Sequence, residues 1–230
     1  MKKIINLLLG VIVCACIAGC KDNSIPADGQ LGQLPGIVKK YGDELDALKA
    51  KLENSSDTKE MQAIVEKGMA IKKKAEGEVK ALADELVGKE IPGEVAQDVP
   101  VKILSPFKIK DIRKDGTVQL ECEVELTADC GYTPDGSVFN LSNIRVMAVG
   151  KDETDAYVHN GGGFRAEKYA DVYPKGSKGT VSTFLAVEGW NVEMMGRLSK
   201  LVIVDKTGDT FKSVKEANRT AKNDYESISK

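Results

Sequence analysis

The residues of this chain that could do chemistry are few and scattered. The only histidine among its 230 residues is His159, which stands beside Asn160 and the glycines 161–163. A serine or cysteine hydrolase needs a nucleophile and an orienting acid around such an imidazole. No G-x-S-x-G element is present, and neither Cys122 nor Cys130 has a typical nucleophile context. We therefore predict a protein that is not an enzyme and has no metal or other cofactor. A hydrolase or an inhibitor that uses loops around His159 is the alternative.

The charge of the chain is nearly balanced, because 33 Lys and Arg stand against 35 Asp and Glu and give a net charge of −2. Balanced charge together with 42% apolar residues is typical of a folded chain rather than a disordered one. A protein that binds nucleic acid through bulk charge carries a clear excess of Lys and Arg. We therefore expect no nucleic-acid partner.

The N-terminus combines a basic start, an apolar segment and a cysteine. Met1-Lys2-Lys3 precedes the apolar residues 4–13, and small residues follow before Cys20. This order is typical of a secretory signal peptide, and the apolar segment is short for a membrane span.

The end of this segment, Ile17-Ala18-Gly19-Cys20, resembles the lipobox of bacterial lipoproteins. The resemblance implies that a peptidase removes residues 1–19 as a signal peptide and that Cys20 carries acyl chains. Several acyl chains hold a protein on a bilayer, because each buried CH₂ contributes about 0.8 kcal/mol. We predict a lipid-anchored protein of the bacterial cell envelope, in the outer membrane at its periplasmic face or on the surface. An ordinary signal peptide with a stray cysteine is the alternative.

Residues 20–33 are polar and contain Pro and Gly, which predicts a flexible tether. Residues 34–96 predict a helical hairpin, because apolar residues recur at steps of three and four on both sides of a polar break. Asp57 and Glu60 after that break predict a capping box. The near-heptad spacing also permits a coiled coil with a partner helix. The two stripes are Ile37, Tyr41, Leu45, Leu48 and Leu52, then Met61, Val65, Gly68, Ile71, Ala75, Val79, Leu82 and Leu86.

Beyond the hairpin, the apolar residues alternate with polar ones. Asp115-Gly116 predicts a two-residue turn between two antiparallel strands. With this turn, Lys108 would face Glu123 on the outer surface, and Ile109 would face Cys122 in the core.

The pattern as a whole predicts an α+β fold. Residues 97–210 predict an antiparallel β-sandwich, with His159 in a hairpin loop between strands 156–159 and 164–167. The polar segment 211–230 permits a C-terminal helix that lies on the helical hairpin. The layout resembles that of uncharacterised lipoproteins of Bacteroidota, which implies an immunoglobulin-like β-domain.

Two cysteines remain once residues 1–19 are removed and Cys20 is acylated. An even pair in an oxidising compartment permits a disulfide between Cys122 and Cys130. A bridge requires the two Cα atoms to lie within about 7 Å, so the chain would have to fold back. Two free thiols are the alternative.

Aromatic residues give the one indication of a binding surface. Trp190 lies next to a predicted strand end, and Tyr169 and Tyr173 lie in a loop-rich stretch with Phe164. Exposed aromatic residues on loops can form a platform for a ligand, whereas Trp190 could instead close one end of the core. We predict a binding or accessory module for an unknown protein or glycan. A structural protein that self-associates through its helical hairpin is the alternative.

Overall fold

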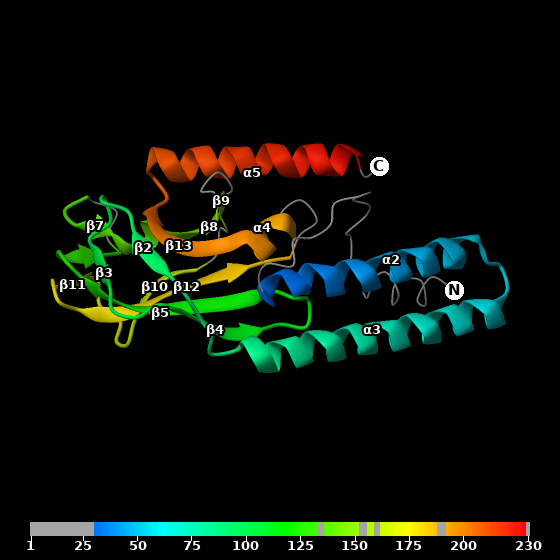
Figure 1. Cartoon of the computed structure of the whole chain (residues 1–230). Coiled ribbons are helices and arrows are strands. Elements are labelled where there is room, and N and C mark those ends of the chain that lie inside the picture. Colours follow the sequence, from blue (N-terminus) through cyan, green and yellow to red (C-terminus); the bar gives the residue numbers. More distant parts are fainter. Residues whose placement is uncertain (1–29, 133–135, 152–155, 159–161, 188–191, 229–230) are drawn as a thin grey trace.

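The computed structural model describes residues 30–132, 136–151, 156–158, 162–187 and 192–228 (Figure 1). The chain is α+β: a pair of helices comes first, strands in three sheets follow, and a long helix ends the chain. The helices are η1 (Gln30–Gly32), α2 (Gln33–Asn54), α3 (Thr58–Leu86), η2 (Leu141–Asn143), α4 (Val192–Arg197) and α5 (Asp209–Ile228). The strands are β1 (Glu90–Ile91), β2 (Gly93–Val95), β3 (Val101–Ile103), β4 (Phe107–Ile112), β5 (Val118–Leu126), β6 (Cys130–Gly131), β7 (Phe139–Asn140), β8 (Ile144–Gly150), β9 (Ala156–Val158), β10 (Gly163–Ala166), β11 (Val172–Tyr173), β12 (Lys178–Leu185) and β13 (Leu198–Asp205).

The predicted helical pair is confirmed by α2 and α3, which we call the arm. Leu45 and Leu48 of α2 lie against Gly68 of α3, where a Cβ atom would make ordinary contacts of 3.9 Å with both leucines. The carboxylate of Asp57 caps α3 by accepting the N–H of Lys59 at 2.8 Å. The carboxylate of Glu60 accepts the hydroxyl of Ser55 at 2.6 Å.

The arm is shorter than predicted, because α3 ends at Leu86 and the residues up to 96 include β1 and β2. Figure 1 shows both helices extending away from the strands. At their base, Leu34 and Leu86 belong to the same apolar core as the strands. At the far end, Leu48, Leu52 and Ile64 form a separate small cluster. The arm is therefore rooted in the core of the β-rich part of the chain.

The strands form one large sheet and two smaller ones. The large sheet has the order β1-β4-β5-β12-β10, with β3 also paired to β5. A second sheet has the order β2-β13-β8-β9, and a third has β11-β6-β7. Most pairs are antiparallel as predicted, but β2 with β13 and β6 with β7 are parallel. Apolar side chains of the large sheet and of β8 and β13 meet in one core, so these sheets pack together.

The predicted register between β4 and β5 is wrong, although the predicted inner face is right. Lys108 lies opposite Glu121 rather than Glu123, and Ile109 lies opposite Leu120 rather than Cys122. All the inward apolar residues of the prediction, namely Phe107, Ile109, Cys122 and Val124, are buried.

The reason for the register error lies in the turn and in a bulge. The N–H of Arg113 donates to the carbonyl of Thr117, and the N–H of Gly116 donates to the carbonyl of Arg113, both at 2.9 Å. The loop therefore holds three residues, and Gly116 has a φ of +82° that favours glycine. The register shifts again between Ile109 and Asp111, where one extra residue is accommodated.

The predicted hairpin around His159 is also wrong. Strand β9 pairs with β8 in the second sheet, whereas β10 pairs with β12 in the large sheet. The chain therefore passes from one sheet to the other between β9 and β10. His159 itself lies outside the described residues.

The predicted C-terminal helix is confirmed by α5, but it lies on the second sheet rather than on the arm (Figure 1). The ring of Phe211 is 4% exposed and packs with Met147, Val158 and Val204. The side-chain amide of Asn218 accepts the N–H of Val158 at 3.0 Å and donates to the carbonyl of Ala156 at 2.9 Å. These two bonds take the place of a further strand beside β9.

Candidate ligand site at a cluster of tyrosines

Four aromatic rings, one at position 132 and three within residues 164–173, meet at one edge of the large sheet. The rings of Tyr132 and Tyr169 are nearly parallel, with centroids 6.3 Å apart and an angle of 10°. The ring of Tyr173 meets Tyr132 edge-on at 6.2 Å and meets Phe164 edge-on at 5.8 Å. We call these four residues the tyrosine cluster.

The pairing of β6 with β11 builds this cluster. Cys130 lies opposite Tyr173, and Gly131 lies opposite Val172. The N–H of Tyr132 then donates to the carbonyl of Asp171 at 3.0 Å. A Cβ atom on Gly131 would lie 2.5 Å from that same carbonyl oxygen, so only glycine permits this close approach.

The tyrosine hydroxyls are bonded within the cluster and its loop. The hydroxyl of Tyr132 donates to the carbonyl of Phe164 at 2.9 Å, and that of Tyr169 donates to the carboxylate of Asp171 at 3.1 Å. The hydroxyl of Tyr173 accepts the N–H of Ala170 at 2.8 Å. These bonds fix the ring orientations before any ligand arrives, which reduces the ordering cost of binding.

The phenols of Tyr132 and Tyr169 both have a raised pKa. Burial raises the pKa of Tyr132 above its ordinary value, the neighbouring Tyr173 and Tyr169 add to this effect, and the charge of Arg165 opposes it. The hydrogen bond to Asp171 is the main reason that the pKa of Tyr169 is also raised. The rings therefore offer neutral faces and no phenolate base.

A shallow cavity of about 490 Å³ opens beside the cluster. The ring of Tyr169 borders it and is 79% exposed. Aromatic faces carry partial negative charge and stack on other rings or on the C–H groups of a ligand. Arg165 can donate hydrogen bonds to a ligand, and Glu167 can accept them. The lining residues are Tyr132, Phe164, Arg165, Ala166, Glu167, Tyr169 and Tyr173.

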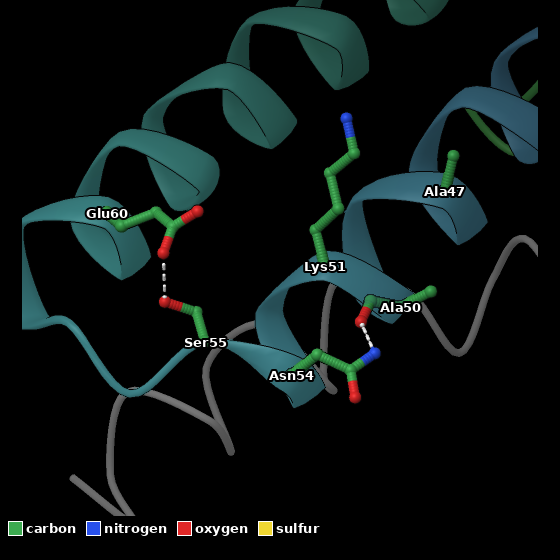
Figure 2. A pocket seen from close by; sticks show the side chains of 6 residues that line it. All are labelled: Ala47, Ala50, Lys51, Asn54, Ser55 and Glu60. Atoms are coloured by element: carbon green, nitrogen blue, oxygen red, sulfur yellow. Dashed lines mark hydrogen bonds between the residues drawn. The ribbon is translucent and has the colours of Figure 1, made fainter.

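A second cavity, of about 430 Å³, lies at the far end of the arm, and Figure 2 shows the side chains around it. The amide of Asn54 donates to the carbonyl of Ala50 at 2.7 Å, and the hydroxyl of Ser55 donates to Glu60. Most polar side chains that line this cavity thus already form hydrogen bonds within the arm, and its apolar lining residues are Ala47 and Ala50. The cavity beside the tyrosine cluster offers more to a ligand.

The two cysteines of the described part are separate buried thiols, so the disulfide that the sequence permits is not formed. Cys122 lies in the core on β5, whereas Cys130 lies on β6 in another sheet. Burial raises the pKa of Cys122 to about 12. Burial and the nearby Asp129 raise the pKa of Cys130 to about 11. Neither thiol is a reactive nucleophile at neutral pH, because the thiolate is the reactive form.

The structure brings together Tyr169 and Tyr173, which the sequence suggested as a platform, and adds Tyr132 and Arg165, which the sequence reasoning missed. Trp190, the third predicted platform residue, lies outside the described residues, as does the predicted lipid-attachment residue Cys20. Across the described ranges, no group of three or more His, Cys, Asp or Glu side chains could hold a metal ion. No described helix combines the length and apolar character that a membrane span needs.

Comparisons with known proteins give no family for this chain. No protein-family model matches it, and neither a curated protein nor a solved structure shows significant similarity.

Proposed function

We propose that this chain is a lipid-anchored protein of the bacterial envelope that binds a protein segment or a glycan without transforming it. The observation that carries the proposal is the tyrosine cluster, whose hydroxyls are bonded internally while ring faces border an open cavity. Such an arrangement suits stacking, and its bonded phenols offer no base or nucleophile for a reaction.

The same proposal assigns the remaining parts of the chain. Cys20 carries the lipid, and the bilayer of the outer membrane is one partner. The tether predicted over residues 20–33 is shorter, because η1 already begins at Gln30. The large sheet and the second sheet act as a β-sandwich of immunoglobulin-like topology, with the ligand site on loops at one end. Binding residues on loops above a rigid scaffold are a common arrangement in such domains.

The lipid anchor has a direct test in cells. We expect a Cys20→Ser variant to lose incorporation of labelled palmitate and to move from the membrane fraction to the soluble fraction. Cys14→Ser and Cys16→Ser are the matched controls, because they remove other cysteines of the same segment. Label that persists in Cys20→Ser, or disappears in either control, would contradict the anchor.

Ligand binding at the tyrosine cluster is tested by replacing one exposed side chain, that of Tyr169. The lipidated chain in detergent micelles is screened against a glycan array and a library of phage-displayed dodecapeptides. We expect the affinity of the selected ligand to fall about two- to tenfold in Tyr169→Ala, because the stacking energy of about 0.5–1.5 kcal/mol is lost. Met69→Ala, at an apolar side chain of α3 that is 60% exposed, is the control. Ligands that bind wild type and Tyr169→Ala equally would refute this site.

A further inference from the structure

One strand beside the tyrosine cluster has a free edge. Strand β10 ends the large sheet and pairs with β12 on one side only. The carbonyl of Phe164 accepts the hydroxyl of Tyr132, so it faces away from β12. Backbone groups alternate in direction along a strand, and the N–H and C=O of Ala166 therefore face the same open edge. No hydrogen bond between described residues uses either group.

Strand β9 also lies at the end of a sheet, but its edge is bonded by a side chain. On β9 the outward N–H of Val158 and carbonyl of Ala156 are both bonded by Asn218 of α5. Exposed edges favour unwanted pairing with other chains, and proteins commonly cover them. Helix α5 therefore covers the edge of β9, whereas no described residue bonds the backbone of Ala166 at the edge of β10.

Charged side chains lie beside the same edge. Arg165 alternates with Phe164 and Ala166, so it lies on the outer face of the sheet, and Glu167 is the exposed residue that directly follows the strand. Both border the cavity, and neither forms an ion pair or hydrogen bond with another described residue. A segment that pairs at this edge would thus meet rings on one face, the charge of Arg165 on the other face, and the charge of Glu167 just past the strand end.

We propose that the cavity binds an extended peptide segment that pairs with the backbone of Ala166 at the free edge of β10. This inference rests on the proposed function and narrows its ligand to a protein segment. Pairing at an open edge is an established mode of peptide recognition, in which backbone bonds give affinity and side-chain pockets give specificity.

The surroundings of Ala166 define the peptide. Tyr132 closes one end of the free edge, so backbone pairing is confined to about one residue of β10. The peptide residue beside the rings is apolar or aromatic and stacks on the tyrosine cluster. A neighbour on the other face carries an acidic group for Arg165, and a basic group beyond the strand end meets Glu167. A glycan would use the ring faces but would leave the backbone of Ala166 unpaired.

A proline at position 166 tests the backbone bond. Ala166→Pro removes the outward N–H and fixes φ at position 166, and proline is tolerated on an edge strand when that N–H faces solvent. The probe is the tightest dodecapeptide selected from the phage library on the lipidated full chain. We expect its affinity to fall about tenfold in Ala166→Pro and to stay within about twofold of wild type in Ala166→Ser. We also expect a copy of the peptide with one central N-methylated amide to lose binding.

The outcomes separate this inference from the proposed function. If the selected ligand is a glycan that Tyr169→Ala weakens and Ala166→Pro does not, the site stands and pairing at the edge of β10 is wrong. Edge pairing is equally wrong if a selected peptide responds to Tyr169→Ala but tolerates both Ala166→Pro and N-methylation. If no ligand responds to Tyr169→Ala, the proposed function fails as well. Amide hydrogen exchange of β10 and β12 in Ala166→Pro checks that this edge of the sheet is intact.

Discussion

Replacing Leu34 by alanine is expected to lower the free energy of unfolding of the whole chain by about 2–5 kcal/mol. Leu34 lies in α2, yet its side chain is 0% exposed and belongs to the core that the strands share. A cavity at this point removes contacts from both the arm and the sheets. Urea unfolding followed by circular dichroism, with hydrogen exchange measured by mass spectrometry, should show helices and strands losing stability together.

Leu52→Ala is the matched comparison, because Leu52 lies on the same helix in the small cluster at the far end of the arm. That cluster has few buried neighbours and lies near solvent, so its loss should loosen the end of the arm locally. Amides of the far halves of α2 and α3 should exchange faster, and those of β5 and β12 should not. If Leu34→Ala gave this same local pattern, the arm would unfold as an independent unit, and the shared core would not couple its stability to that of the sheets.

Alkaline pH is expected to destabilise the chain through its two buried thiols. Burial raises the pKa of Cys122 from 9.0 to about 12 and that of Cys130 from 9.0 to about 11. The unfolded chain can ionise both thiols above pH 9, whereas the folded chain holds them protonated. Their contribution to stability is therefore complete below pH 9 and is lost as the pH rises toward 11 and 12. At about pH 10.5 each thiol costs about 2 kcal/mol relative to neutral pH.

The double variant Cys122→Ala, Cys130→Ala isolates this effect. Lysine and tyrosine residues also titrate in this range, but they do so in both proteins. The free energy of unfolding, measured in urea between about pH 7.5 and 10.5, should fall about 4 kcal/mol more in the wild type than in the variant. Equal slopes would mean that the thiols ionise freely in the folded chain. A thiol-specific reagent should likewise label neither cysteine of the native protein at about pH 7.5.

Local patterns in the sequence were enough to predict α2, α3 and α5 and the inner faces of β4 and β5. The spacing of Leu45 and Leu48, or the alternation through Phe107 and Ile109, reports directly which face is buried. The register of β4 with β5 could not be predicted in the same way. A two-residue turn and a three-residue loop both accept Asp115-Gly116, and a bulge at polar residues leaves no trace in the apolar pattern.

Only some residues of the candidate site could be predicted from the sequence. Tyr169 and Tyr173 stand out because they are aromatic residues in a loop-rich stretch. Tyr132 joins them through the pairing of β6 with β11, which no local pattern encodes. The role of Ala166 depends on its backbone and on the place of β10 at the end of the sheet, so its residue type carries no signal.

Leu31 and Leu34 are buried in the main core, and this burial determines where a force on the N-terminal end of the chain would enter the fold. Under the proposed anchor, about ten residues separate Cys20 from Gln30, a reach of about 35 Å when fully extended. Tension between the bilayer and a bound ligand would enter at Leu31, cross the core, and leave through β10. The far end of the arm lies off this line and carries no tension. Under the proposed anchor, the sheets would transmit the tension, and the arm would be free to contact other envelope components.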